Sequence, residues 1–215
     1  MSNKFKQKKG FTIIEVVLVL AIAGLIFLMV FFVLPQAMAG QRDTERRQAM
    51  SRVQSALVQY QTNNKSKRNN LPAPDAVAFS ATDEGFPTDC NGNSACSFIK
   101  NYLNTTDSVA DNQNLFIDPD GFAYNMVITE NWASSTNGLT TLYATGLSDT
   151  SSLKVNGTGN DQYATIEGSD PLKAHVIYVI PGAKCDGENA VKSELRHFAV
   201  LYRLENSSIY CGDSD

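Results

Sequence analysis

Four cysteines are the residues of this chain with the clearest capacity for chemistry. Cys90 and Cys96 enclose a short loop rich in asparagine, glycine and serine, whereas Cys185 and Cys211 bracket the last apolar segments. In an exported protein, four cysteines predict two disulfide bonds, for which three connectivities exist. A zinc site is disfavoured, because the sequence has no C-x2-C spacing and no histidine pair near the cysteines. We therefore expect two disulfides and no metal.

The two histidines and the paired acids match no catalytic or metal-binding pattern. His175 and His197 have no cysteine, serine or acid at a motif spacing, and we interpret both as surface or hydrogen-bonded histidines of strands. Asp118 and Asp120 do not form an EF-hand, because glycine follows one residue after the second acid rather than three, so a tight turn is expected. The motifs G-x-S-x-G and H-E-x-x-H are also absent. We expect no enzymatic activity and no cofactor.

Charge and hydrophobicity are distributed unevenly along the chain. Hydrophobic residues make up 43% and charged residues 19% of the sequence, which excludes wholesale disorder. Residues 1–10 hold four lysines and no acid, whereas from Lys65 onward 10 Lys/Arg stand against 19 Asp/Glu, a net charge of −9. Sequence-independent nucleic-acid binding needs cations along the phosphates. We therefore expect no nucleic-acid partner for the acidic part.

The N-terminal apolar run allows two general interpretations. Residues 16–34 are 19 apolar or glycine residues without a charge, and a helix of that length is about 28 Å long, close to the ~30 Å hydrocarbon core of a bilayer. A transmembrane anchor is the first interpretation. A secretory signal peptide is the second, because residues 37–39 (Ala-Met-Ala) before Gly40 look like a small-residue cleavage site. Against the second, signal-peptide apolar regions usually run ~7–15 residues, and Glu15 has no role in one.

A third interpretation rests on the sequence KKGFTIIEVV at residues 8–17, which resembles the processing site of a type IV prepilin. The resemblance implies that a prepilin peptidase cuts between Gly10 and Phe11 on the cytoplasmic side and N-methylates Phe11. Glu15 is then the fifth residue of the mature chain, where the family has its glutamate, and Gly24 is the fourteenth, where it often has glycine. Because the motif couples a basic leader, a glycine, an aromatic residue and a glutamate, we favour this interpretation.

The position of Glu15 makes physical sense under this resemblance. An ionised carboxylate at membrane depth costs ~2.5–3.5 kcal/mol on insertion scales, so such a group usually has a partner. Cleavage after Gly10 creates a cation, the new amine of Phe11. The resemblance implies that the glutamate of one subunit pairs with the amine of its neighbour, and such a pair supplies register more reliably than net stability. The alternative is an acid near the membrane interface with no partner.

The segment from residue 11 to residue 62 is expected to be mostly helical. As one rod it would be roughly 78 Å long, too long for a compact domain, so its N-terminal half should project and pack elsewhere. Pro35 should break or kink the helix. The resemblance implies that Gly24–Pro35 can be extended in an assembled filament, although many family members have their proline three residues earlier.

The second half of this segment has an amphipathic pattern. Met50, Val53, Leu57 and Tyr60 recur at spacings of 3, 4 and 3 and predict one apolar helix face packed on a sheet, with a coiled-coil seam as the alternative. We expect the polar side to hold Arg42, Asp43, Glu45, Arg46, Arg47 and Arg52.

The remainder of the chain predicts strands and turns. The expected elements are a short helix at 97–103, a turn at 118–121, strands at 122–128, 139–144, 163–166, 174–180 and 197–204, and a closing strand at Ile209-Tyr210. The two long strands at 174–180 and 197–204 should be antiparallel. The resemblance further implies that Cys185–Cys211 closes the C-terminal loop, and we expect the matching local pair Cys90–Cys96.

The expected fold class is α+β: a long N-terminal α-helix packed on an antiparallel sheet of about four strands, with a disulfide-stapled C-terminal region. Four parts follow: a leader peptide (1–10), a hydrophobic transmembrane and filament-core helix (11–35), the amphipathic half of the helix (36–64) and a globular head (65–215).

The resemblance implies a mechanical function. The chain should be a structural subunit of a type IV pilus, which forms a homopolymeric filament for adhesion or twitching motility, and the presence of Glu15 favours the bulk subunit, or major pilin. It should begin as a single-pass protein of the cytoplasmic membrane and end in an extracellular filament. Its partners should be other copies of the chain, a prepilin peptidase, and an assembly platform with its ATPase. The alternatives are a minor pilin or a pseudopilin of a type II secretion or DNA-uptake system, and a membrane-tethered or secreted binding domain.

Overall fold

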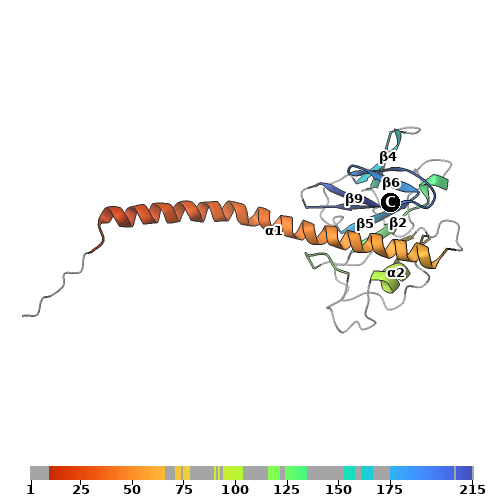
Figure 1. Cartoon of the computed structure of the whole chain (residues 1–215), viewed down its shortest axis with the longest axis horizontal. Coiled ribbons are helices and arrows are strands. Elements are labelled where there is room, and N and C mark those ends of the chain that lie inside the picture. The colour runs from red at the N-terminus through yellow and green to blue at the C-terminus, as the bar shows by residue number, and fades with distance from the viewer. Residues whose placement is uncertain are drawn as a thin grey trace, which may run out of the picture. The chain divides into compact units, whose positions relative to one another are not determined.

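The computed structural model describes residues 10–65, 71–73, 75–77, 90, 92, 94–103, 116–121, 124–134, 153–157, 161–166, 175–205 and 207–214. The chain divides into two units, Met1–Gln41 and Arg42–Asp215. The elements are α1 (Ile13–Asn63), β1 (Asp75–Val77), α2 (Ser94–Phe98), the π-helix η1 (Ile99–Leu103), β2 (Asn125–Ile128), the 3-10 helix η3 (Trp132–Ser134), β3 (Leu153–Asn156), β4 (Tyr163–Ile166), β5 (Val176–Pro181), β6 (Ala183–Asp186), β7 (Asn189–Lys192), β8 (Phe198–Arg203) and β9 (Ile209–Asp213) (Figure 1). The leader residues 1–9 and the predicted strand at 139–144 lie outside the described residues.

Helix α1 contains 51 residues, which corresponds to about 77 Å at 1.5 Å per residue. It ends at Asn63, one residue beyond the expected end of the helical segment. Pro35 lies inside the helix, so the helix does not break at this residue. A kink at Pro35, the other expected outcome, stays a prediction. A proline removes one hydrogen bond of the helix, and good helix formers beside it, Leu34 before it and residues 36–39 (Gln-Ala-Met-Ala) after it, favour its continuation. Residues Gly24–Pro35 are helical in the single chain; an extended stretch in a filament stays a prediction.

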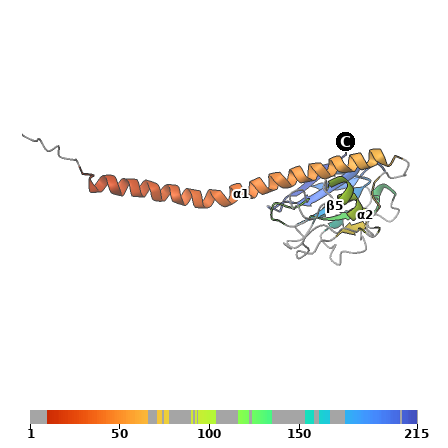
Figure 2. The same ribbon diagram turned by 90° about the horizontal axis from the view of Figure 1, so that it is seen from below.

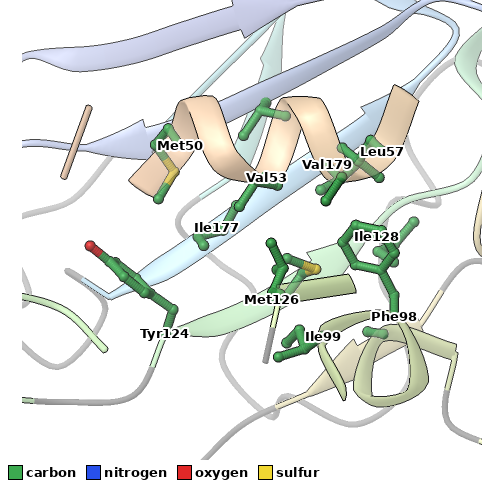
Figure 3. Packing of buried hydrophobic residues seen from close by; sticks show 14 of the residues in the cluster. Met50, Val53, Leu57, Phe98, Ile99, Tyr124, Met126, Ile128, Ile177 and Val179 are labelled. Carbon is green, nitrogen blue, oxygen red and sulfur yellow. The ribbon is translucent and has the colours of Figure 1, made fainter. Parts of the chain in front are cut away.

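The part of α1 from Arg42 onward covers one face of a five-stranded sheet with the strand order β1-β2-β5-β8-β9 (Figure 2). Met50, Val53 and Leu57 are fully buried, as their spacing predicted. They pack in one hydrophobic cluster with Ile177 and Val179 of β5 (Figure 3). Residues of β2, β8, α2 and η1 also belong to this cluster. The apolar helix face is therefore a docking face within the domain rather than a coiled-coil seam.

A second sheet, with the order β3-β4-β7-β6, packs against the five-stranded sheet. Tyr178 and Ile180 of β5 belong to this second hydrophobic cluster, together with Ala164 of β4 and Ala190 of β7. Since both faces of β5 and β8 are covered, these strands contain unbroken apolar runs, VIYVIP in β5 and FAVLY in β8. The α+β class is confirmed, but two sheets of five and four strands replace the expected single sheet of about four.

Strand pairing is mostly antiparallel. The two long C-terminal strands pair as predicted, with Tyr178 of β5 opposite Leu201 of β8. The pair β2–β5 is parallel, which no pattern in the sequence predicted. The predicted turn is present, since the N–H of Gly121 donates to the carbonyl oxygen of Asp118 at 2.8 Å. The predicted helix at 97–103 appears as α2 followed by η1.

Gly182, which joins β5 to β6, is required by its backbone conformation and its surroundings. Its φ is +74°, and a Cβ at this position would lie 2.5 Å from the backbone nitrogen of Ala133. We expect Gly182→Ala to destabilise the domain by about 3 kcal/mol, from the left-handed conformation plus overpacking. The measurement is urea unfolding of the purified chain followed by fluorescence of Trp132, the one tryptophan of the sequence and fully buried.

Gly187 supplies the control for this variant. Its φ is also positive, at +62°, but a Cβ there would meet nothing within 4 Å. Gly187→Ala should therefore cost only about 1 kcal/mol. Equal losses for the two alanine variants would contradict the steric argument at Gly182.

Candidate functional site

The predicted cleavage site lies just before α1. Gly10, Phe11 and Thr12 precede the helix without regular secondary structure, and the Phe11 side chain is 87% exposed. A Cβ at Gly10 would meet nothing within 4 Å, so glycine is not required there by the packing of the described residues. The bond between Gly10 and Phe11 is thus accessible in the single chain, as a peptidase substrate requires.

Glu15 lies in the first turn of α1 and is bound to Thr12. Its Oε2 accepts hydrogen bonds from the backbone N–H of Thr12 at 3.0 Å and from the Thr12 hydroxyl at 2.9 Å. The backbone N–H of Glu15 in turn faces Thr12 Oγ1 at 3.4 Å. This reciprocal arrangement is a capping box, in which two otherwise unsatisfied N–H groups of the helix start find partners. The role of Thr12 was not predicted, although the T-x-x-E spacing at 12–15 signals it.

The apolar residues of α1 up to Leu34 are not covered by the rest of the chain. The large hydrophobic side chains from Phe11 to Leu34 each have an exposed fraction between 48% and 87%. Among the described residues, one helix, α1, is long and apolar enough to cross a membrane, and its most apolar 18-residue stretch is not buried by the rest of the chain. A Cβ at Gly24 would meet nothing within 4 Å. A surface this apolar needs a cover of lipid or protein.

A buried ion-pair network, here called the Arg46 network, ties the second half of α1 to the head. Arg46 donates from Nε and Nη2 to the two oxygens of Asp118, at 2.8 and 2.9 Å. The Tyr202 hydroxyl donates to Oδ2 of the same carboxylate at 2.8 Å, and the backbone N–H of Asp120 donates to Oδ1 at 3.0 Å. Nδ1 of His175 lies 3.6 Å from Oδ1. The Asp118 side chain is fully buried and that of Arg46 is 4% exposed.

The same network reaches the turn between β8 and β9. Arg46 also lies 3.2 Å from Asp43 and 3.0 Å from Glu205, and Arg42 pairs with Glu205 through two hydrogen bonds. The backbone N–H of Glu205 donates to Asp43 at 3.0 Å. The expectation that Arg46 belongs to the polar side of the helix is therefore wrong. The spacing of the residues could have predicted its burial, because positions 43 and 46 continue the helical repeat of the buried positions 50, 53 and 57.

The protonation states of this network follow from burial and neighbouring charge. Burial acts to raise the pKa of Asp118, but the nearby His175 and the hydrogen bonds from Arg46 and Tyr202 hold that pKa well below its usual range. Burial acts to lower the pKa of Arg46, and the carboxylates raise it further than burial lowers it. Both side chains are therefore charged at neutral pH, and the pair is an ionic one.

Three potential metal ligands meet in this network. One ligand atom each of Asp118, Asp120 and His175 lie within 4.8 Å of one another. However, both oxygens of Asp118 already accept hydrogen bonds from Arg46, and further donors reach each of them. Since Arg46 supplies the cation that the carboxylate needs, this geometry favours a structural role over metal binding.

Both locally paired disulfides are present in the structure, Cys90–Cys96 and Cys185–Cys211. The first joins a residue ahead of α2 to the middle of that helix. The second joins β6 of the four-stranded sheet to β9 of the five-stranded sheet. It therefore fastens the two sheets together, a role that sequence spacing did not indicate.

Comparison with known proteins identifies the N-terminal segment. A family model described as the prokaryotic N-terminal methylation motif matches residues 5–31, which include Gly10, Phe11, Glu15 and Gly24. No curated protein and no solved structure matches the chain. The chain carries a type IV pilin-like prepilin leader, and the motif supports a type IV pilin-like or pseudopilin protein.

Proposed function

We propose that this chain is a structural subunit of a type IV pilus, and that it is the bulk subunit, or major pilin. A prepilin peptidase would remove residues 1–10 and methylate Phe11, and an assembly platform with its ATPase would move the subunit from the cytoplasmic membrane into a surface filament. The filament would serve adhesion or twitching motility. The proposed role is mechanical and involves no catalysis by this chain.

One combination of observations carries the proposal. The methylation motif coincides with a helix whose apolar side chains are uncovered by the chain itself. Lipid covers such a surface before assembly, and the same surface of neighbouring copies can cover it in a filament. Because lipid tails are as apolar as leucine, transfer between the two environments gains little hydrophobic energy, so close packing and polar pairing must supply the specificity.

The first test is the intact mass of the protein purified from its host. We expect a species that begins at Phe11, carries one methyl group and lacks the four hydrogens of two disulfides. A species that begins at Gly40 would instead identify a signal peptide and a secreted soluble domain. A species that keeps residues 1–10 would identify a membrane-tethered domain, so either result overturns the proposal.

Glu15→Ala tests the assembly step itself. Removing one partner of a buried charge pair leaves the neighbour's amine without its counter-ion, so we expect sheared surface filaments to fall at least about tenfold. The amount of subunit in the membrane should stay unchanged. Glu45→Ala is the matched control, because Glu45 lies on an exposed position of the same helix. Normal filament yield from Glu15→Ala would contradict the assigned role.

A minor pilin or pseudopilin is the second candidate, because the methylation motif is compatible with it. The two candidates differ in stoichiometry. A bulk subunit accounts for nearly all protein in sheared filaments, whereas a minor pilin is a small fraction and a pseudopilin gives no long surface filament.

A further inference from the structure

The outer side of the four-stranded sheet carries a polar hollow that the helix-driven assembly of a filament does not use. Its volume is about 630 Å³, within the range of ~300–1,000 Å³ that is usual for small-molecule sites. Residues of β4, β6 and β7 line it. Ala164, Ala183 and Ala190 of these strands belong to the hydrophobic cluster between the two sheets, so the residues that alternate with them point outwards. The hollow therefore lies on the surface of the head.

The floor of the hollow is a row of three side chains, one from each strand. Val191 of β7 lies opposite Tyr163 of β4 on one side and opposite Lys184 of β6 on the other. Tyr163 is 37% exposed, and a lysine can cover apolar neighbours with its methylene stem. The row thus offers an apolar strip with an aromatic ring at one end and an ammonium group at the other.

Polar side chains surround this strip. They comprise two carboxylates, two amides and a second ammonium group, from Asp161, Asp186, Gln162, Asn189 and Lys192. None of these five side chains makes a hydrogen bond or an ion pair with the other residues that the structure describes. The rim therefore holds both donors and acceptors that a ligand can use. Together with Lys184, its positive and negative charges balance.

The β6 side of the hollow is fixed in place. Cys185 lines the hollow, is joined to Cys211 of β9, and donates its backbone N–H to Asp213 at 2.7 Å. Asp186 and Asn189 lie opposite each other at the end of the β6–β7 hairpin. Since a disulfide holds the hairpin that carries them, less ordering is needed when a ligand binds.

This combination of charges and shapes disfavours several classes of ligand. A phosphate-rich ligand needs an excess of cations, and a calcium ion needs converging oxygen ligands without competing cations. An apolar ligand needs a mostly apolar lining. A pyranose ring fits better, because it has one face of C–H groups and a rim of hydroxyls, each of which both donates and accepts hydrogen bonds. The C–H face matches the apolar strip, and the hydroxyls match the balanced polar rim.

We propose that this hollow binds a neutral pyranose residue of a cell-surface glycan. The C–H face of the sugar packs on the Tyr163 ring, and its hydroxyls exchange hydrogen bonds with the rim, chiefly with the amide of Asn189 and the carboxylate of Asp186. The inference rests on the proposed function for its biological use, which is adhesion. The binding itself is a property of the single chain and is tested on it.

The first experiment measures binding by the full-length chain in a detergent without a sugar headgroup. Saturation-transfer NMR is recorded with the methyl glycosides of glucose, galactose, mannose and N-acetylglucosamine. We expect transfer to at least one of the four. Tyr163→Ala should raise its Kd about tenfold, because the stacking ring is lost, whereas Tyr163→Phe should stay close to the unsubstituted chain. Leu195→Ala is the matched control, since Leu195 is also 37% exposed but does not line the hollow.

A second substitution tests the rim. Asn189→Ala removes a donor and an acceptor together, so we expect a Kd about fivefold higher. Urea unfolding of each variant should match the unsubstituted chain, because these side chains have no partners to lose. Absence of transfer to all four glycosides would overturn the proposal, and so would equal Kd values for Tyr163→Ala and Leu195→Ala.

A glycan of this chemistry has two sources, the surface to which the cell adheres and the polysaccharide of the cells themselves. Both are tested with filament-bearing cells and the free glycoside that binds. Inhibition of adhesion to glycoside-coated beads, absent in Tyr163→Ala cells, identifies the first source. Inhibition of clumping between cells identifies the second. If neither process is inhibited, the hollow has no part in adhesion.

The outcomes separate the inference from the proposed function. If the chain forms no filament but binds a glycoside through Tyr163, the proposed function fails and the site stands. If filaments form normally and no glycoside binds, the function stands and the site is wrong.

Discussion

Replacement of Asp118 by alanine should destabilise the head by about 3–5 kcal/mol, the range for breaking a buried ion pair from one side. The change leaves the Arg46 guanidinium buried without its bidentate partner and removes the acceptor of the Tyr202 hydroxyl. Asp43, Asp120 and Glu205 still contact Arg46, but each reaches a single nitrogen, Nη1 for Asp43 and Glu205 and Nη2 for Asp120. The loss is measured by urea unfolding with Trp132 fluorescence. A loss below about 1 kcal/mol, the level of an exposed pair, would contradict the argument.

Two further variants show whether the loss comes from the ion pair. Asp120→Ala lies in the same turn and removes a partner of the same arginine, but its side chain is 36% exposed, so we expect a loss of about 1 kcal/mol or less. The double variant Arg46→Met/Asp118→Leu removes both charges and fills the space with apolar groups. It should be more stable than the single variant Arg46→Met, because the single variant leaves the fully buried Asp118 carboxylate without its cation and the double variant does not.

The same network predicts how stability depends on pH. Because the pKa of Asp118 is held below its usual range in the folded state, its contribution is complete above about pH 4, the unfolded value, and is lost as the pH falls further. The pKa of Glu205 is also lowered, chiefly by its hydrogen bond from Arg42, and changes stability in the same direction. We therefore expect stability to decrease below about pH 4, and to decrease less steeply in Asp118→Asn.

Local patterns in the sequence predicted the elements that depend on neighbours along the chain. The spacing of Met50, Val53 and Leu57 predicted the buried helix face. The motif around Gly10 and Glu15 predicted the leader. Both patterns consist of residues that are close together in the sequence. The turn at 118–121 was predicted for the same reason, whereas β5 and β8 were predicted from their content of valine, isoleucine and tyrosine.

Long-range partners could not be predicted in this way. Arg46 is separated from Asp118 by 72 residues, so no local pattern connects them. An arginine on a helix is normally taken to face solvent, even where its position continues a row of apolar residues. The strands of the head were expected to form a single sheet. The unbroken apolar run of β5 instead reflects two covered faces, which demands a second layer. The parallel pair β2–β5 depends on a crossover that no local pattern specifies.

Removal of the Cys185–Cys211 bond, as Cys185→Ala/Cys211→Ala, is the second change with a large expected effect. The bond closes a loop with a sequence separation of 26. The chain-entropy model gives a stabilisation of the folded state of about 3.5 kcal/mol for a loop of this length. The corresponding value for Cys90–Cys96, with a separation of 6, is about 2.2 kcal/mol. For a chain of this size, a loss of about 3.5 kcal/mol corresponds to a fall in Tm of roughly 10 °C. The measurement is thermal unfolding with Trp132 fluorescence.

Position in the fold should widen the difference between the two bonds. Cys185–Cys211 connects β6 to β9 and so holds together the two sheets that bury Trp132, whereas Cys90–Cys96 stays beside α2. Asp213 supports the same junction, because its Oδ2 accepts from the backbone N–H of Cys185 at 2.7 Å. Reduction should lower the Tm of the unsubstituted chain and leave a variant lacking all four cysteines unchanged. A larger loss from the Cys90/Cys96 pair than from the Cys185/Cys211 pair would show that the sheets are held by packing alone.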